Sequence, residues 1–511
     1  MSILQRNKSS LNKKLDNTML GFYFLIFSII TGIYYAYAIT NGNMNLLETS
    51  LLGCTYTSMW DNFLVGRVDV DPGCISYEGF YLPDGKAYTY FAMFPSFLRG
   101  FIEIFFQRGS TDWSKVSIVL GGLLAVSAST LAYYQIANKL SSKPKSVLFY
   151  TSIFAITMAL GSPITSHMAT GWIYNESSIW GLAWSLVFIL FFTQVIIHKK
   201  VTPTILFLLS LSSSFAMLSK ITFGICTGIA LTLLLTLVLL QVVNKKLSFS
   251  CIDKILKYFP LPGFELSTKK VVAMMASGFI PLLISILFTL GLNYARWGNL
   301  FEFSPFEYSD IMQISRKLSL EEAGLYNPKR IPHSFVYYFI PEPFHFSKEF
   351  PHIKIEGYMS GLQKFFPPIF IDWIDPANPL VVNSPCFFLF SILGIFSFLK
   401  VFDRLGLILM FVFGVQFIMI LAYAGLSLRY LTETMPLLTV LSLASFQTLI
   451  NFEKNKKIRI LSSRAFFSFL TMIGIYTAAI TILQLKIWTW SVPDEVKEGI
   501  KTFFNNVQKK D

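Results

Sequence analysis

Carboxylates gather in one polar stretch of an otherwise apolar chain. Asp61, Asp69, Asp71, Glu78 and Asp84 fall within 24 residues, between two long apolar segments. Ionised carboxylates are costly inside a bilayer, so a cluster of this kind is expected outside it. There it could accept protons or hold a cation. We therefore predict that the first loop, residues 41–114, carries an active site.

Asp61 is the leading candidate for a general base, because Trp60 beside it would anchor it at the level of the lipid headgroups. Asp69 and Asp71 are the alternatives. This Asp-x-Asp pair could also hold a divalent cation, although the pattern alone is weak for that purpose. Asp71 also begins a Pro-Gly turn, in which it would only accept a backbone N–H. The choice among the three aspartates stays open.

Glu176 is the second acid of interest. It lies in the segment TGWIYNESSIWG, which places it at the outer mouth of a predicted span and on the same side as Asp61. A catalytic role is one interpretation. The other is stabilisation of the helix N-terminus by a negative charge, worth less than about 1 kcal/mol.

Isolated cations could bind a phosphate on the same side. Arg429 can bind phosphate oxygens in a bidentate way, but it could equally form an ion pair with Glu433 on the same helix face. Lys220 is a further candidate, for which extension of the side chain toward the membrane surface is the alternative. Arg67 and Lys86 are weaker candidates of the same kind.

Cysteines and histidines add little that is specific. Cys54 and Cys74 both lie in the first loop and could form a disulfide, which would restrain the carboxylates between and around them; two free thiols are the alternative. His333, His345 and His352 are too irregularly spaced for a zinc motif, so we expect no metal site there and assign them to loop packing.

The elements that position these residues are membrane helices. The chain has 511 residues, of which 53% are hydrophobic and 14% charged, with a mean hydropathy of +0.56. Apolar runs near the length needed to cross a bilayer recur throughout. We predict an all-α polytopic membrane protein with about 11 transmembrane helices, near residues 19–40, 115–138, 146–161, 177–197, 203–219, 222–243, 271–293, 385–400, 405–423, 432–450 and 465–489.

Charge fixes the predicted orientation. With an inner N-terminus, the inner segments hold 22 of the 42 basic residues and five acidic ones, as the positive-inside rule requires. The segment Ala87–Phe106 is apolar but contains Pro95, Arg99 and Glu103, so we place it as a helix on the outer membrane surface. The first span is expected to be an uncleaved anchor, and the C-terminus to be outside. The basic charge is thus topological and does not indicate nucleic acid as a partner.

Two outer regions are large enough to build a site, residues 41–114 and residues 294–384. We divide the chain into a catalytic module over residues 1–450, which includes both loops, and a terminal span with an outer tail over residues 451–511. No phosphate-binding loop, dinucleotide fingerprint or serine-hydrolase motif occurs, which argues against nucleotide hydrolysis, redox and serine-hydrolase chemistry.

This order of features resembles the GT-C superfamily of membrane glycosyltransferases. The segments GRVDVDPGCISYEGFYLPDGKAYTYFAMFPSFLRG, YNESSIWG, NYARWGNLFEF and RYLTETMPLL also resemble uncharacterised bacterial multi-span proteins grouped with these enzymes. The resemblance implies hexosyl or pentosyl transfer from a polyprenyl-phosphate carrier, with an acidic residue of the first outer loop in catalysis. It also implies a bacterial inner membrane, an active site on its outer face, and a lipid-linked sugar and membrane lipids as partners.

Two other functions fit the same outline. A transporter of lipids or polysaccharide precursors would need charges within its spans, and the spans have few. A polysaccharide polymerase or ligase would share the outer site but would join preassembled glycans. The sequence leaves the sugar, the acceptor and the oligomeric state open.

Overall fold

The computed structural model describes residues 3–105, 112–247, 250–259, 267–309, 314–340, 345–346, 353–354, 369–374, 379–454, 460–488 and 492–508. Within these residues, nine helices are long and apolar enough to cross a membrane. They are α1 (Ile3–Ile39), α5 (Ser114–Leu140), α6 (Pro144–Leu160, extended by η2, Pro163–Met168), α7 (Ile173–His198), α9 (Ile221–Leu247), α11 (Thr268–Trp297), α18 (Leu407–Ala422), α19 (Leu428–Lys454) and α20 (Ile460–Trp488).

Two shorter apolar helices, α8 (Pro203–Ser219) and α16 (Pro385–Ile395), fall on the remaining predicted spans. An α-helix of 17 residues is about 26 Å long and one of 11 residues about 17 Å, so α16 is too short to cross a hydrocarbon core of about 30 Å. The prediction of an all-α polytopic membrane protein is confirmed. The count of eleven spans stays a prediction.

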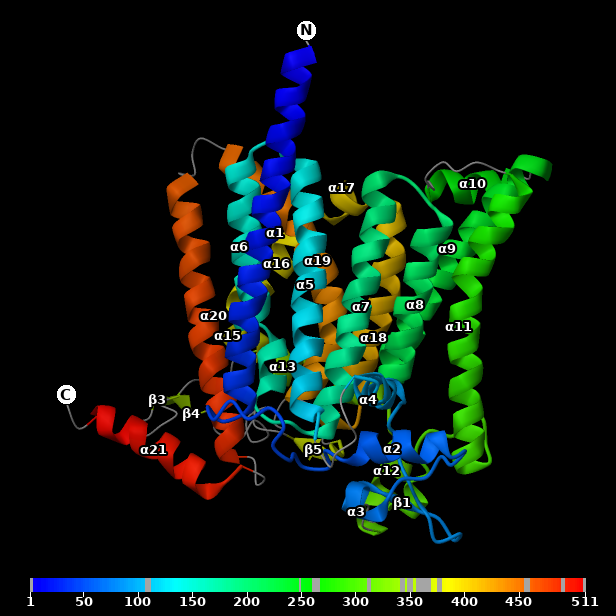
Figure 1. The fold of residues 1–511 in the computed structure, drawn as a ribbon, viewed down its shortest axis with the longest axis vertical. Helices are drawn as coiled ribbons and strands as arrows, with labels where there is room; N and C mark the ends of the chain where they lie inside the picture. The colour runs from blue at the N-terminus through cyan, green and yellow to red at the C-terminus, as the bar shows by residue number, and fades with distance from the viewer. Residues whose placement is uncertain are drawn as a thin grey trace.

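The helices run side by side along the long axis of the molecule, with α7 and α19 among the most buried (Figure 1). Small residues allow the closest approaches, because a bilayer offers little hydrophobic drive between helices. A methyl group added to Gly394 of α16 would meet the Leu441 carbonyl oxygen of α19 at 1.7 Å. Ser391 and Ser442 join the same two helices by a hydroxyl pair at 2.9 Å.

The two ends of the bundle differ. The N-terminus lies at one end, and the C-terminal helix and the elements of the first loop lie at the other, which we call the loop end (Figure 1). Short helices α10 (Ser250–Tyr258) and α17 (Phe398–Phe402) lie at the end of the N-terminus. By the positive-inside rule the loop end is expected to be the outer one.

The loop end is built from short elements. The first loop forms α2 (Thr55–Leu64), α3 (Pro72–Ile75), η1 (Ser76–Glu78), β1 (Phe80–Tyr81), β2 (Ala87–Tyr88) and α4 (Phe94–Glu103). The second forms η3 (Phe306–Tyr308), α12 (Ile314–Ala323), η4 (Pro328–Arg330), α13 (Ile331–Phe339), β3 (His345–Phe346), β4 (Ile353–Lys354), β5 (Trp373–Ile374) and α15 (Leu380–Asn383). The C-terminal helix is α21 (Asp494–Gln508).

Strand pairs connect these segments. β1 pairs with β2 in an antiparallel hairpin, with Phe80 opposite Tyr88. β3 and β4 are also antiparallel. β5 pairs in parallel with β6 (Gly425–Leu426), which immediately precedes α19. The second loop is therefore fixed to the segment that begins α19.

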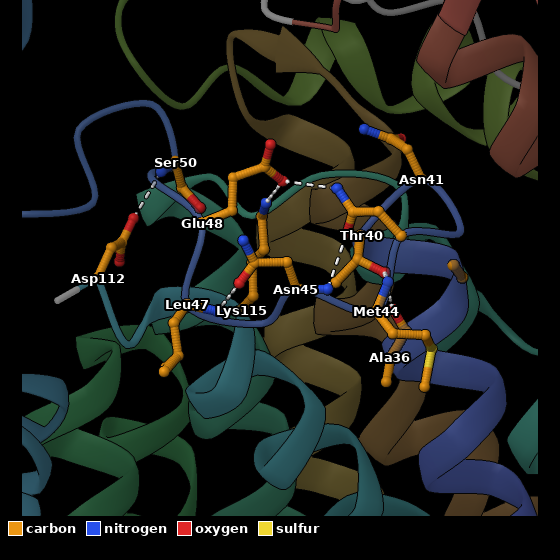
Figure 2. Close-up of polar contacts among 12 residues, drawn as sticks. Ala36, Thr40, Asn41, Met44, Asn45, Leu47, Glu48, Ser50, Asp112 and Lys115 are labelled. Atoms are coloured by element: carbon orange, nitrogen blue, oxygen red, sulfur yellow. Dashed lines mark hydrogen bonds and ion pairs between the residues drawn. The ribbon is translucent and has the colours of Figure 1, made fainter.

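Both ends of the first loop are tied to the helix bundle (Figure 2). The Asp112 carboxylate accepts a hydrogen bond from the Ser50 N–H at 2.6 Å, and Lys115 of α5 forms an ion pair with Glu48 at 2.7 Å. Lys486 of α20 donates to the Asn41 side chain at 2.7 Å. These contacts fix the entry and exit of the loop, so that its acidic middle is presented in one place.

The predicted surface helix at Ala87–Phe106 is shorter than expected, and its placement on the membrane surface stays a prediction. Only Phe94–Glu103 is helical, the segment begins as strand β2, and Phe106 lies outside the described residues. Phe94 packs on Trp184 of α7 and Phe215 of α8, with ring centroids 5.6 and 5.2 Å away. One face of the helix thus packs on the bundle, whereas Phe101 on α4 is exposed.

Candidate active site

A polar cluster forms at the loop end where η1, α7 and α19 meet. Arg429, the second residue of α19, lies over the ring of Tyr174 from α7, with its guanidinium carbon 4.4 Å from the centroid. The ring of Tyr430 lies 5.3 Å from the same carbon. Contact with two aromatic faces attracts the cation and holds the planar guanidinium in place.

Glu78 of η1 belongs to this cluster. Its side chain is buried, with 9% of the residue exposed, and it forms a hydrogen bond with Tyr174. Burial raises the pKa of Glu78, while the Tyr174 hydroxyl and the charges of Arg429 and Arg316 act in the opposite direction. A buried carboxyl with a raised pKa beside a fixed cation is an arrangement typical of active sites.

A disulfide holds the backbone next to Glu78. Cys54, at the start of α2, is bonded to Cys74 in α3, four residues before Glu78. The Thr55 hydroxyl also donates to the Cys74 carbonyl at 2.9 Å. The sequence alone leaves open whether Cys54 and Cys74 form a disulfide. The structure contains this bond, which fixes the turn that carries Glu78.

Lys220 lies beside the cluster in a buried ion pair. Its ammonium group is 2.6 Å from the carboxylate of Glu433, which also accepts a hydrogen bond from Thr222 at 2.6 Å. Ser178 accepts a further hydrogen bond from Lys220 at 3.1 Å. Extension toward the membrane surface is therefore the wrong interpretation for Lys220, and Glu433 has a cationic partner that helical spacing does not reveal.

A small cavity of about 50 Å³ opens next to Arg429. Its wall comes from η2 and the turn that follows it, from the start of α7, from the start of α19 and from α20. Arg429 is the charged residue in this wall, which contains no carboxylate. The lining residues are Ser166, His167, Ala169, Thr170, Trp172, Asn175, Ser427, Leu428, Arg429 and Leu485.

Three of the four acids predicted for the site, Asp61, Asp69 and Asp71, belong to the first loop. Asp61 is exposed on α2. Asp69 is buried and accepts a hydrogen bond from Arg67 at 3.0 Å, which lowers the pKa of its carboxyl. Asp71 is exposed before α3, and its backbone carbonyl accepts from the N–H of Cys74 at 2.9 Å, as in a turn. None of the three lines the cavity.

Glu176 is fully buried in an ion pair with Arg99 of α4, with 2.8 Å between the nearest nitrogen and oxygen atoms. Both side chains have at most 1% of their area exposed. Arg99 also donates to the Ser114 hydroxyl at 3.3 Å. Glu176 pairs with Arg99 of α4 and does not line the cavity, although Asn175 beside it does.

The weaker cation candidates form a separate group. Arg67 is held by Asp69, and the charge of Lys86 from the β1–β2 hairpin also contributes to the lowered pKa of Asp69. Of the histidines, His333 is buried in α13, the side chain of His345 is outside the described part, and His352 lies outside the described residues altogether. Across the described ranges no set of three His, Cys, Asp or Glu side chains is arranged to hold a metal ion.

Sequence reasoning missed two residues of the cluster and one of the cavity wall. In the sequence Glu78 is one of five acids in the first loop. Its position four residues after Cys74 distinguishes it only once the disulfide is known. Tyr174 gives no signal beyond its place in an aromatic segment. His167 lies in an apolar stretch, TSHMATG, without any other ionisable residue.

No protein family and no curated protein matches the chain. Among solved structures, it is similar to the Archaeoglobus fulgidus oligosaccharyltransferase tethered to an acceptor peptide, with a TM-score of 0.45 and 15% identity. The apo form of the same enzyme gives 0.44 and 15%. The archaeal oligosaccharyltransferase AglB from the same organism, in complex with an inhibitory peptide and a dolichol-phosphate, gives 0.45 and 14%.

The similarity covers 94% of this chain but only 59%, 60% and 59% of those three chains. The chain thus spans about three fifths of the length of the structures it matches.

Proposed function

We propose that the protein is a glycosyltransferase, which moves a sugar from a polyprenyl-phosphate carrier to an acceptor hydroxyl at the outer membrane face. The observation that carries the proposal is the meeting of Glu78, Tyr174 and Arg429 at the loop end of a bundle of membrane helices. A substrate with a lipid tail and an anionic head would place its tail among the helices and its head at this level.

The cluster offers the two groups that the reaction needs. Glu78 would take the proton of the acceptor hydroxyl as its oxygen attacks the anomeric carbon. The bond from that carbon to the phosphate oxygen breaks, and the negative charge that develops on the leaving phosphate would be stabilised by Arg429. The proton ends on Glu78, whose raised pKa suits a group that gains and loses protons.

The distribution of charge in the spans supports a reaction at the surface over transport. Outside the N-terminal part of α1 that precedes its apolar span, Gly21–Ile39, the Asp, Glu, Lys and Arg residues of the described spans lie within about six residues of a helix end, as with Glu176 in α7, Arg296 in α11 and Lys486 in α20. A pathway through the membrane for a charged cargo would need such groups at mid-depth. A polymerase or ligase remains the alternative within the enzymes, since it would use the same acid and cation.

Reconstitution with labelled lipid-linked sugars tests the proposal. The wild-type protein, supplied with polyprenyl-phosphate monosaccharides and a membrane extract as the source of acceptor, should release polyprenyl phosphate and label a product. We expect Arg429→Gln to slow this transfer by about 10²–10³, the usual cost of losing one donor to a developing anion.

Arg404→Gln is the matched control. Arg404 lies at the opposite end of the bundle and also has its guanidinium carbon 4.4 Å from a tyrosine ring centroid, that of Tyr258. Transfer should be unchanged in this variant. Equal losses in the two variants would contradict the role of Arg429, and transfer only from preassembled glycan carriers would assign the protein to the polymerases or ligases.

A further inference from the structure

One buried histidine in the cavity wall has no role in the reaction as described above. His167 has 1% of its area exposed, lines the cavity, and is the residue before the end of η2. Its Nε2 atom has no hydrogen-bond partner among the described residues. A buried polar atom without a partner is costly, and one at the wall of a cavity points to a ligand that supplies the missing hydrogen bond.

The neighbours of the imidazole indicate which hydrogen bond is missing. The Ser166 hydroxyl donates its hydrogen to the Pro163 carbonyl at 2.7 Å. Its oxygen can then only accept from Nδ1 of His167, which lies 3.5 Å away. In a neutral imidazole this places the hydrogen on Nδ1 and leaves a lone pair on Nε2. Nε2 of this cavity-lining residue is therefore an acceptor, which fits a hydroxyl group and not a phosphate oxygen.

The rest of the wall adds a positive charge to this acceptor. Arg429 is its charged member, and the uncharged polar members include Thr170, Asn175 and Ser427. The Asn175 amide is fixed by hydrogen bonds to the backbone and side-chain oxygens of Thr170, both at 3.0 Å. A rigid wall with one cation and one hydrogen-bond acceptor suits a ligand that carries an anionic group and a hydroxyl group a short distance apart.

We propose that this cavity binds the sugar-phosphate head of the donor, with the phosphate toward Arg429 and a sugar hydroxyl donating a hydrogen bond to Nε2 of His167. The inference rests on the proposed function and assigns His167 as a positioning residue for the sugar. A volume of about 50 Å³ is enough for a few water molecules, so the cavity takes one ring edge with its hydroxyl and has no room for a preassembled oligosaccharide.

Binding without turnover tests this assignment. The ligands are a short-chain prenyl phosphate and a panel of its hexosyl and pentosyl phosphodiesters, titrated against the full-length protein in nanodiscs without acceptor. Wild-type protein should bind at least one glycosyl ester more tightly than the prenyl phosphate itself. In His167→Ala this preference should fall by about five- to tenfold, the usual value of one hydrogen bond, while the affinity for the prenyl phosphate is retained.

Two further variants make the outcome decisive. His167→Gln, whose amide can both accept and donate, should keep part of the preference and guards against a loss that comes only from misfolding. His333→Ala removes another buried histidine that does not line the cavity, and should leave the preference intact. Loss of affinity for both ligands in His167→Ala with a folded protein, or an unchanged preference, would overturn the assignment of His167.

The same titrations separate this assignment from the proposed function. Failure of the wild type to bind the prenyl phosphate, or equal binding by Arg429→Gln, would overturn the phosphate role of Arg429. Binding of the prenyl phosphate without any preference for a glycosyl ester would overturn only the role of His167.

Discussion

Arg99 and Arg429 lie at the same end of the molecule and are used in opposite ways. Arg99 is buried against Glu176, and each of the two side chains has at most 1% of its area exposed. Arg429 is half-buried on two tyrosine rings and forms part of a cavity wall. A carboxylate is the partner of the first arginine in the packed interior, whereas the second is part of the wall of a cavity. The burial of a charge thus indicates structure or function only together with what surrounds it.

The same comparison separates two acids of the loop end. Glu176 and Glu78 are both buried glutamates of the loop end, and both contact an element distant in sequence. Glu176 meets a cation in the packed interior, so its loss should affect folding. Glu78 forms a hydrogen bond with Tyr174, and the charge of Arg429 acts on its carboxyl group, so its loss should affect chemistry.

The largest effect is expected for Glu78→Gln. The amide keeps the shape of the side chain but cannot take a proton, so transfer should slow by about 10²–10⁴. The rate of product formation in the reconstituted assay measures this, with the unfolding temperature as a control for folding. Wild-type transfer in this variant would remove Glu78 from the mechanism.

Breaking the other pair should act on stability. Arg99→Met leaves Glu176 buried without a cation and should lower the free energy of unfolding by about 3–5 kcal/mol. The double variant Arg99→Met/Glu176→Leu replaces both charges by apolar groups and should recover most of that loss. Denaturant unfolding in detergent measures both. If the double variant folds well but has no activity, then this pair is more than structural.

The pH dependence of transfer should show the raised pKa of Glu78. A general base works in its deprotonated form, so the rate should fall as pH decreases through the pKa of Glu78, and the midpoint should lie above the ordinary value of a glutamate. Arg429→Gln removes a charge that lowers this pKa, so the midpoint should move further upward. An unchanged midpoint in Arg429→Gln would show that the charge of Arg429 does not act on the group whose titration controls the rate.

The smallest effect is expected for Asp61→Asn. The sequence makes Asp61 the leading base, but its side chain is exposed on α2 and outside the cavity wall. Substitutions at exposed positions away from a site usually change little, so the rate should stay within about threefold of wild type. A loss comparable to that of Glu78→Gln would return Asp61 to the centre of the mechanism.

The fold was largely predictable, because long apolar runs have few alternatives in a membrane protein. The site was predictable only in part. The first loop and Arg429 were identified from charge placed outside the apolar runs, which is visible in the sequence. The ion-pair partners are not visible in the sequence, because they lie on different elements. Arg99 and Glu176 are 77 positions apart (176 − 99). Lys220 and Glu433 are 213 positions apart (433 − 220). Helical spacing reveals only partners within one helix.

The separation of Glu78 and Arg429 along the chain also has a consequence for biogenesis. Glu78 belongs to the first loop, which follows α1, whereas Arg429 lies in the first turn of α19, about 350 positions later in the chain (429 − 78). During synthesis the acid is therefore delivered long before the cation. The pair can form only after α19 has been inserted, so a partly made chain that ends before α19 lacks the proposed combination of acid and cation.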